Sequence, residues 1–136
     1  MRPGDLLAIY GSLRRGLGLP DAPELSGASR HVGSCLLQGR LYDLGDYPGL
    51  LTARPGCVHG EFLRIIAPSL SDALDAFELY DPRDEAGSLY LRRRVILLRP
   101  RRLAWVYIYN RTPHGPVIPL GDWRRHRLIR QTPRLP

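Results

Sequence analysis

Gly11 and Ser12 directly follow the first apolar segment of the chain. That segment, residues 6–10, is apolar at consecutive positions, which predicts a strand covered on both faces. The loop after it would present several consecutive backbone N–H groups with little side-chain cover. Such a run of amides binds a carboxylate or a developing oxyanion. A plain turn that packs Tyr10 into the core is the alternative. The chain contains no lysine and no Gly-x-x-x-x-Gly-Lys pattern, so this is not a phosphate loop.

Glu78 is the second candidate for chemistry. The apolar pattern predicts a helix over residues 70–79, in which Leu70, Leu74 and Glu78 lie on one stripe at i, i+4 and i+8. An acid at the end of an apolar stripe is partly removed from water. This raises its pKa toward the value that a general base needs near neutral pH. A helix-end glutamate that turns to solvent is the alternative, and the helical pattern leaves both open.

Two further carboxylates and a row of aromatic residues are weaker candidates. Asp75 lies on the same predicted helix, and we expect a structural hydrogen-bonding role for it. Glu61 alternates with apolar residues along a predicted strand, so it faces either the interior of the sheet or, as is more usual, solvent or an arginine partner. Trp105, Tyr107 and Tyr109 share one face of a later strand, where they form either core or the wall of a pocket.

Several other chemistries are disfavoured by residue spacing. The four histidines lack ligand spacing, so no metal site is expected. Cys35 and Cys57 have neither a metal-type nor a redox-type spacing and no base nearby in sequence, so we expect two free, buried thiols. Ser12 lacks the Gly-x-Ser-x-Gly elbow of serine hydrolases.

The composition fits a single domain over residues 1–136, with 43% hydrophobic residues to form a core. The net charge is +7, and all 20 basic residues are arginines, scattered along the chain in pairs or a triplet at most. This arrangement suits the steering of an anionic substrate, and nucleic-acid binding is not expected. There is no apolar run of about 18 residues and no leader pattern. A cytoplasmic protein without membrane association is the expectation.

Short strands are expected to make up most of the fold. They are predicted at residues 6–10, 30–37, 39–44, 59–66, 90–98 and 103–109, with a turn-rich loop at 45–49 and a candidate bulge at Gly60. The order of strands and helices has no βαβ rhythm. This order predicts an α+β fold in which five or six strands form a barrel-like sheet.

The predicted helices are few. A short one is expected over about residues 21–26. The main helix follows Pro68, where Ser69 and Asp72 have the spacing of a capping box, and it is expected to end near residue 81, before a proline. Asp122 is expected to cap a last helix that reaches about residue 130.

Motifs in a fixed order along the chain carry a family resemblance. They are Tyr10-Gly11-Ser12-Leu13-Arg14, Gly39-x-Leu41-Tyr42-Asp43-Leu44-Gly45, Val58-His59-Gly60-Glu61, Leu74-Asp75-Ala76-Phe77-Glu78, Val106-Tyr107-Ile108-Tyr109 and Gly121-Asp122-Trp123. The series resembles the γ-glutamylcyclotransferase-like superfamily, and more specifically its small AIG2-like bacterial members. The resemblance spans nearly the whole chain, from about residue 6 to residue 127.

This resemblance implies a small mixed β-barrel with flanking helices and a cavity at the barrel mouth, occupied by a small-molecule γ-glutamyl substrate. Substrate-binding residues would be Tyr10, Gly11, Ser12, Leu13, Arg14, Arg15 and Tyr107. Glu78 would act as general base and acid in cyclising the glutamyl group to 5-oxoproline, with no metal or organic cofactor. The family often has glycine after this acid, whereas Leu79 stands here, so the local turn is expected to differ.

Two other classes of function stay open at this stage. One is a non-catalytic module that binds a small molecule in the same cavity. The other is an RNA-associated protein that uses the arginines, whose binding would weaken steeply with salt. The loops at 46–56 and 81–88 carry no motif that names the amine on the glutamyl group, and no pattern indicates an oligomeric state.

Overall fold

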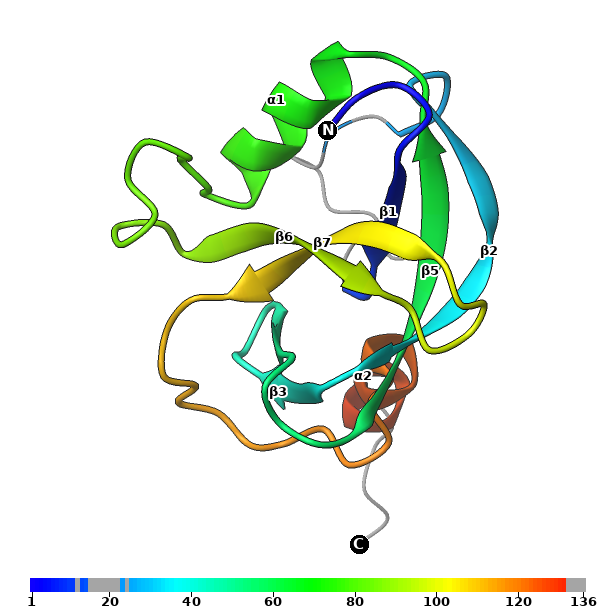
Figure 1. Cartoon of the computed structure of the whole chain (residues 1–136). Coiled ribbons are helices and arrows are strands. Elements are labelled where there is room, and N and C mark those ends of the chain that lie inside the picture. Colours follow the sequence, from blue (N-terminus) through cyan, green and yellow to red (C-terminus); the bar gives the residue numbers. More distant parts are fainter. Residues whose placement is uncertain (12, 15–22, 24, 132–136) are drawn as a thin grey trace, which may run out of the picture.

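The computed structural model describes residues 1–11, 13, 14, 23 and 25–131. Within them the chain forms seven strands and two helices (Figure 1). In chain order these are β1 (Leu6–Ile9), β2 (Ser29–Gln38), β3 (Arg40–Asp43), β4 (Pro48–Leu51), β5 (Cys57–Ile65), α1 (Ser69–Phe77), β6 (Tyr90–Ile96), β7 (Leu103–Tyr109) and α2 (Trp123–Gln131). The α+β class is confirmed. Of the two helices in this part of the chain, neither is long and apolar enough to span a bilayer.

The main sheet has the strand order β2-β5-β1-β7-β6. β1 runs parallel to β7, and the other pairings are antiparallel, so the sheet is mixed as expected. The prediction of a central, doubly covered strand is confirmed, because β1 lies in the middle and all its residues are buried. Leu6 and Ala8 belong to one core cluster, whereas Leu7 and Ile9 belong to the other.

In the part of the chain that the structure describes, no continuous ladder of hydrogen bonds closes the barrel, and seven strands lie in two sheets where one barrel of five or six was expected. The two edges of the main sheet meet through an isolated bridge. The Leu36 N–H donates to the Arg99 carbonyl (2.8 Å), and the Leu98 N–H donates to the Leu36 carbonyl (2.8 Å). β3 and β4 pair separately. In Figure 1, α1 lies near one end of this curved sheet and α2 near the other.

Strand β4 corrects the expected loop over residues 45–49. Pro48 and Gly49 pair with Asp43 and Tyr42 of β3. Proline is tolerated here because it is the first residue of a strand that pairs on one side. Glycine is required at position 49, since a Cβ atom there would lie 2.9 Å from the Leu44 side chain and 3.0 Å from the Tyr109 ring.

Gly60 is not a bulge. The irregularity of the β2–β5 ladder lies between His31 and Gly33. Gly60 instead allows close packing of strands, because a Cβ atom there would lie 2.7 Å from the Ile9 carbonyl oxygen.

The helix boundaries also differ from expectation at α1. Its N-cap is Pro68, which forms no side-chain capping hydrogen bond, so the capping box expected at Ser69 is absent. The helix ends at Phe77, earlier than the expected end near residue 81. Residues 21, 22 and 24 of the short helix expected over residues 21–26 lie outside the described residues. The other three, Pro23, Leu25 and Ser26, are not helical, and Ser26 forms an isolated β-bridge with Ser29.

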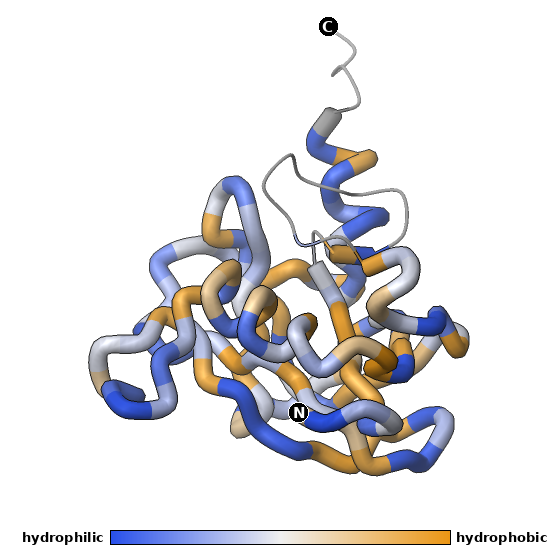
Figure 2. Tube along the Cα trace, turned by 90° about the horizontal axis from the view of Figure 1, so that it is seen from above, coloured by the Kyte–Doolittle hydropathy of each residue, from blue (hydrophilic) through white to orange (hydrophobic). Residues whose placement is uncertain are grey.

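The cap of the last helix is confirmed. The Asp122 carboxylate accepts a hydrogen bond from the Arg125 N–H (3.2 Å) at the start of α2. Figure 2 shows hydrophobic residues along the inner strands, whereas the outer loops and most of α2 are hydrophilic. Trp123, at the start of α2, is fully buried in the core, whereas Leu128 and Ile129 further along the helix are exposed.

Candidate active site

One cavity of about 280 Å³ brings together the end of β1 and the end of α1. Its described lining is largely apolar and aromatic. The lining residues are Ala8, Ile9, Tyr10, Gly11, Leu13, Tyr47, Pro48, Phe77, Glu78, Leu79, Leu89, Tyr90 and Tyr107. The structure thus places Glu78 in one cavity with Gly11 and Leu13, which lie more than 60 positions away in the sequence.

Glu78 is held by the turn that ends α1. The Tyr80 N–H donates to the Asp75 carbonyl (2.9 Å), and the Leu79 N–H donates to the Ala76 carbonyl (3.3 Å). This pair of bonds is a Schellman motif, in which Glu78 is the C-cap and the next residue adopts a left-handed conformation. Leu79 does so, with a φ of 55°. The turn ends the helix at Phe77 and fixes the backbone of Glu78 beside the cavity.

The carboxyl group of Glu78 is poised for proton transfer near neutral pH. Burial raises its pKa from 4.5 to about 7, because the charged form loses solvation. Among the described residues, none forms a hydrogen bond or an ion pair with this carboxylate. A pKa near 7 lets one group both accept and return a proton at neutral pH.

Three tyrosines surround the carboxylate, and their hydroxyls are all engaged. Tyr10 donates to the Tyr107 carbonyl (2.6 Å), Tyr90 donates to the Pro48 carbonyl (2.7 Å), and Tyr107 donates to an Asp75 carboxylate oxygen (2.6 Å). The pKa values of all three are raised, first by burial and in smaller part by the charge of Glu78. Tyr10 and Tyr107 therefore present ring surface to the cavity, with hydroxyls that hold its walls in place.

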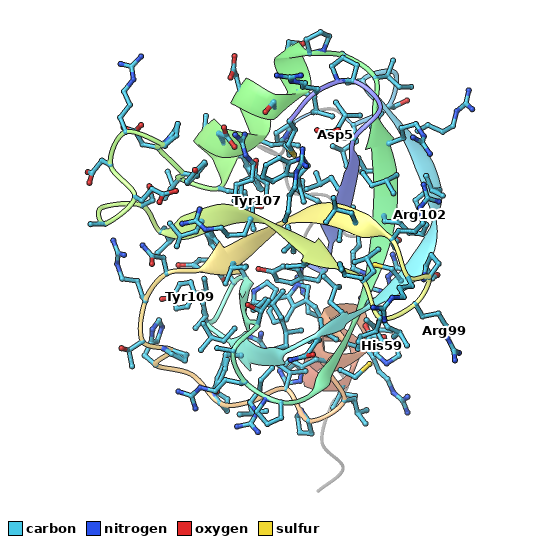
Figure 3. All side chains as sticks on the ribbon, in the orientation of Figure 1. Asp5, His59, Arg99, Arg102, Tyr107 and Tyr109 are labelled. Carbon is cyan, nitrogen blue, oxygen red and sulfur yellow. The ribbon has the colours of Figure 1, made fainter. Side chains whose placement is uncertain are left out.

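Asp75 has the structural role that its position on the helix suggested. Besides the bond from Tyr107, it accepts a hydrogen bond from Arg92 (2.7 Å), and Arg92 also donates to Ser71 (2.9 Å). Figure 3 shows Tyr107 on the side of the sheet that faces α1. This network ties the last turns of α1 to β6 and β7, and so positions Glu78 indirectly.

The loop after β1 is described at Gly11, Leu13 and Arg14. Gly11 and Leu13 line the cavity, and the Arg14 N–H closes the turn on the Gly11 carbonyl (3.1 Å). In the described part of the structure, the amides of Gly11 and Leu13 have no hydrogen-bond acceptor. The other two residues expected in this loop site, Ser12 and Arg15, lie outside the described residues.

Arg14 is placed away from the cavity lining. Its side chain is 8% exposed and forms an ion pair with Asp122 (2.8 Å). The Arg14 guanidinium thus links the first loop to α2. The expected contact of Arg14 with substrate stays a prediction. Sequence patterns miss the pairing with Asp122 because 108 positions separate the two residues.

Other candidates lie elsewhere in the fold. Glu61 is buried, at 6% exposure, and lies 3.7 Å from both His31 and Arg124, so it is arginine-paired but not solvent-facing. Both thiols are free as expected. Cys35 is buried, which raises its pKa to about 12, whereas the expectation of a buried Cys57 is wrong, since β5 begins there at the surface.

The cavity also contains residues that the sequence did not single out, notably Tyr90, Tyr47 and Leu89. The register of the β6–β7 pair offers a clue to Tyr90, because this residue pairs with Tyr109 across the ladder. The centroids of the two rings lie 5.5 Å apart, in an edge-to-face arrangement. For Tyr47 and Leu89, which lie in connections between elements, local sequence offers no such clue.

Comparison with known proteins identifies the family of this chain. The family model described as "Gamma-glutamyl cyclotransferase, AIG2-like" matches residues 7–125. No curated protein matches the chain.

Solved structures show the same fold. An uncharacterised protein of Pyrococcus horikoshii is 22% identical, with a TM-score of 0.71, and the match covers 93% of this chain and 95% of the other. The protein ytfP of Escherichia coli is 31% identical, with a TM-score of 0.63 and coverages of 90% and 98%. An AIG2-like protein of Mus musculus is 21% identical, with a TM-score of 0.65 and coverages of 90% and 89%. By its family match, this chain belongs to the AIG2-like γ-glutamyl cyclotransferase family.

Proposed function

We propose that this protein cyclises a γ-glutamyl amide to 5-oxoproline and releases the amine. The observation that carries the proposal is the Glu78 carboxyl group, with its pKa near 7, in the same cavity as the amides of Gly11 and Leu13. The family match supports a cyclotransferase-type reaction on a small molecule.

The reaction needs one proton shuttle and no redox step. The substrate's neutral α-amine attacks its own γ-carbonyl carbon, forming the ring C–N bond. Glu78 accepts the proton that this nitrogen loses and returns it to the departing nitrogen as the original amide C–N bond breaks. Backbone amides of the loop after β1 would stabilise the oxyanion that develops on the γ-carbonyl oxygen.

Much of the rate enhancement would come from the shape of the cavity. Nucleophile and electrophile belong to one molecule, so the protein has to hold the glutamyl chain folded with the amine near the carbonyl. The rings of Tyr10, Tyr90 and Tyr107 suit this task, because their hydroxyls are anchored and their positions fixed. A cavity of about 280 Å³ lies near the lower end of the range of ligand pockets, roughly 300–1,000 Å³, and fits a substrate of dipeptide size.

Substitution Glu78→Gln tests the proposal, since glutamine keeps the shape and removes the base. We expect the rate of 5-oxoproline release from a panel of γ-glutamyl dipeptides and γ-glutamylamines to fall by about 10²–10⁴-fold. Asp72→Asn is the matched control, because Asp72 is an exposed carboxylate on the same helix. This control should retain the full rate.

Two results would count against the mechanism. A Glu78→Gln protein that releases 5-oxoproline as fast as the parent would show that Glu78 is not the proton shuttle. A parent protein that binds members of the panel and yields no product over hours would instead indicate the non-catalytic binding module.

A further inference from the structure

We infer that the amine released from the substrate is apolar and that Leu79 selects it; this rests on the proposed function of the cavity. Leu79 has a φ of 55°, which lies in the left-handed region. At the corresponding position of a Schellman motif glycine is usual, because a side chain there is sterically disfavoured. Leucine at this position therefore has a conformational cost.

Packing in the core does not explain why leucine occupies this position. The side chain is 62% exposed, and yet it lines the cavity. A large apolar residue that is both strained and exposed beside a candidate active site indicates a role in function. The backbone on which it lies is well fixed, since the Leu89 N–H also donates to the Leu79 carbonyl (3.0 Å).

The neighbouring wall has the same chemical character. Phe77, Leu79 and Leu89 line the cavity around Glu78, and the described lining contains no arginine, no histidine and no second carboxylate. A charged group moved from water to such a wall without a partner is strongly disfavoured. Glu78 itself is committed to the reacting nitrogen atoms. An alkyl or aromatic amine fits this wall, whereas an amine with a distal ammonium or carboxylate group does not.

Two isosteric substrates test the inference. In γ-glutamyl-n-pentylamide the distal group is a methyl, and in the γ-glutamyl monoamide of 1,4-diaminobutane an ammonium takes its place. We expect kcat/KM for 5-oxoproline release to be at least tenfold higher for the pentylamide. For Leu79→Gly we expect kcat/KM of the pentylamide to fall by about tenfold, mainly through KM, which is the usual size of such a loss in an apolar pocket. The diaminobutane amide should change little.

The controls separate binding from folding. Leu98→Ala removes an exposed leucine, 50% accessible, that is not among the cavity-lining residues, and it should leave both substrates unaffected. Leu79→Asn is a second variant that tolerates the left-handed conformation. It should show the same loss as Leu79→Gly, with a folded thermal transition in both.

Equal kcat/KM values for the two amides, or an equal loss with both in Leu79→Gly, would overturn the inference while 5-oxoproline formation still supported the proposed function. If no substrate yielded 5-oxoproline, the proposed function would fail. In that case the affinities of the Glu78→Gln protein for the two amides, measured by calorimetry, would still test whether the cavity prefers an apolar amine. Tighter binding of the pentylamide supports the inference, and equal affinities overturn it.

Discussion

Glu78 combines reactivity with a cost in stability. Its carboxyl group has a pKa of about 7 in the folded protein and an ordinary value of 4.5 in the unfolded chain. Between these two pH values the folded state holds a proton that the unfolded state has released. Stability therefore falls as pH rises from 4.5 to 7, and above pH 7 the full penalty of about 3 kcal/mol remains.

Glu78→Gln should raise the free energy of unfolding at pH 8 by about 1–3 kcal/mol, because glutamine has no charge to desolvate. At pH 4.5 the difference should be small, since Glu78 is then protonated in the folded state and already half protonated in the unfolded chain. Urea unfolding at both pH values measures this. A Glu78→Gln protein that is less stable than the parent at pH 8 would show that the carboxylate is stabilised in the fold.

The same pKa sets the pH dependence of the proposed reaction. A general base must be deprotonated in the free protein, so kcat/KM, expressed per substrate with a neutral α-amine, should rise with pH and reach half its maximum near pH 7. The pH profile of 5-oxoproline release measures this. A base with an unshifted carboxyl pKa would instead give a profile that is flat above about pH 5.5.

At the scale of elements, α1 is a short helix with an unusual end. The sequence predicts its apolar stripe, and Leu70 and Leu74 are buried as expected. Its end was expected near residue 81, because a proline follows there, but the helix ends at Phe77. The Schellman turn ends it first, and its usual sequence mark, a glycine, is absent. Sequence patterns therefore place Glu78 on the apolar stripe but do not reveal that it is the C-cap.

Leu79→Gly should stabilise the protein, even though it removes a side chain. Relief of the left-handed conformation is expected to raise the free energy of unfolding by about 1 kcal/mol, less the small apolar contact that is lost. The m-value in urea should stay unchanged. Leu98→Ala, which relieves no strain, is the control and should show no gain. A clear loss of stability in Leu79→Gly would mean that the leucine packs structurally, and the argument from strain would fail.

At the scale of the whole molecule, an ion pair between Arg14 and Asp122 joins the first loop to the last helix, and Arg14 is nearly fully buried. Asp122 is also the N-cap of α2. Burial opposes ionisation of Asp122, but hydrogen bonds from Arg125 and Arg14 outweigh this effect and lower its pKa below 3.8.

Asp122→Ala should therefore destabilise the protein by about 3 kcal/mol, because it leaves a buried guanidinium without its partner and removes the cap. The loss should be fully present above pH 4. It should shrink as pH falls through the lowered pKa, since the parent then loses its carboxylate too. Asp122→Asn keeps a capping oxygen and should lose less. Thermal unfolding of the three proteins between pH 3 and pH 7 checks this, and equal stability of Asp122→Ala and the parent at pH 7 would contradict it.

The amino-acid sequence by itself determined the features that depend on residues within one element. The doubly apolar β1, the stripe that ends at Glu78, the cap at Asp122 and the α+β class all follow from periodicity or from neighbouring residues. Only the tertiary structure decided the burial of Glu61, the pairing of Arg14 with Asp122, strand β4 and the tyrosine wall of the cavity. The reason is physical: periodicity fixes which face of an element is apolar, but not which distant face packs against it.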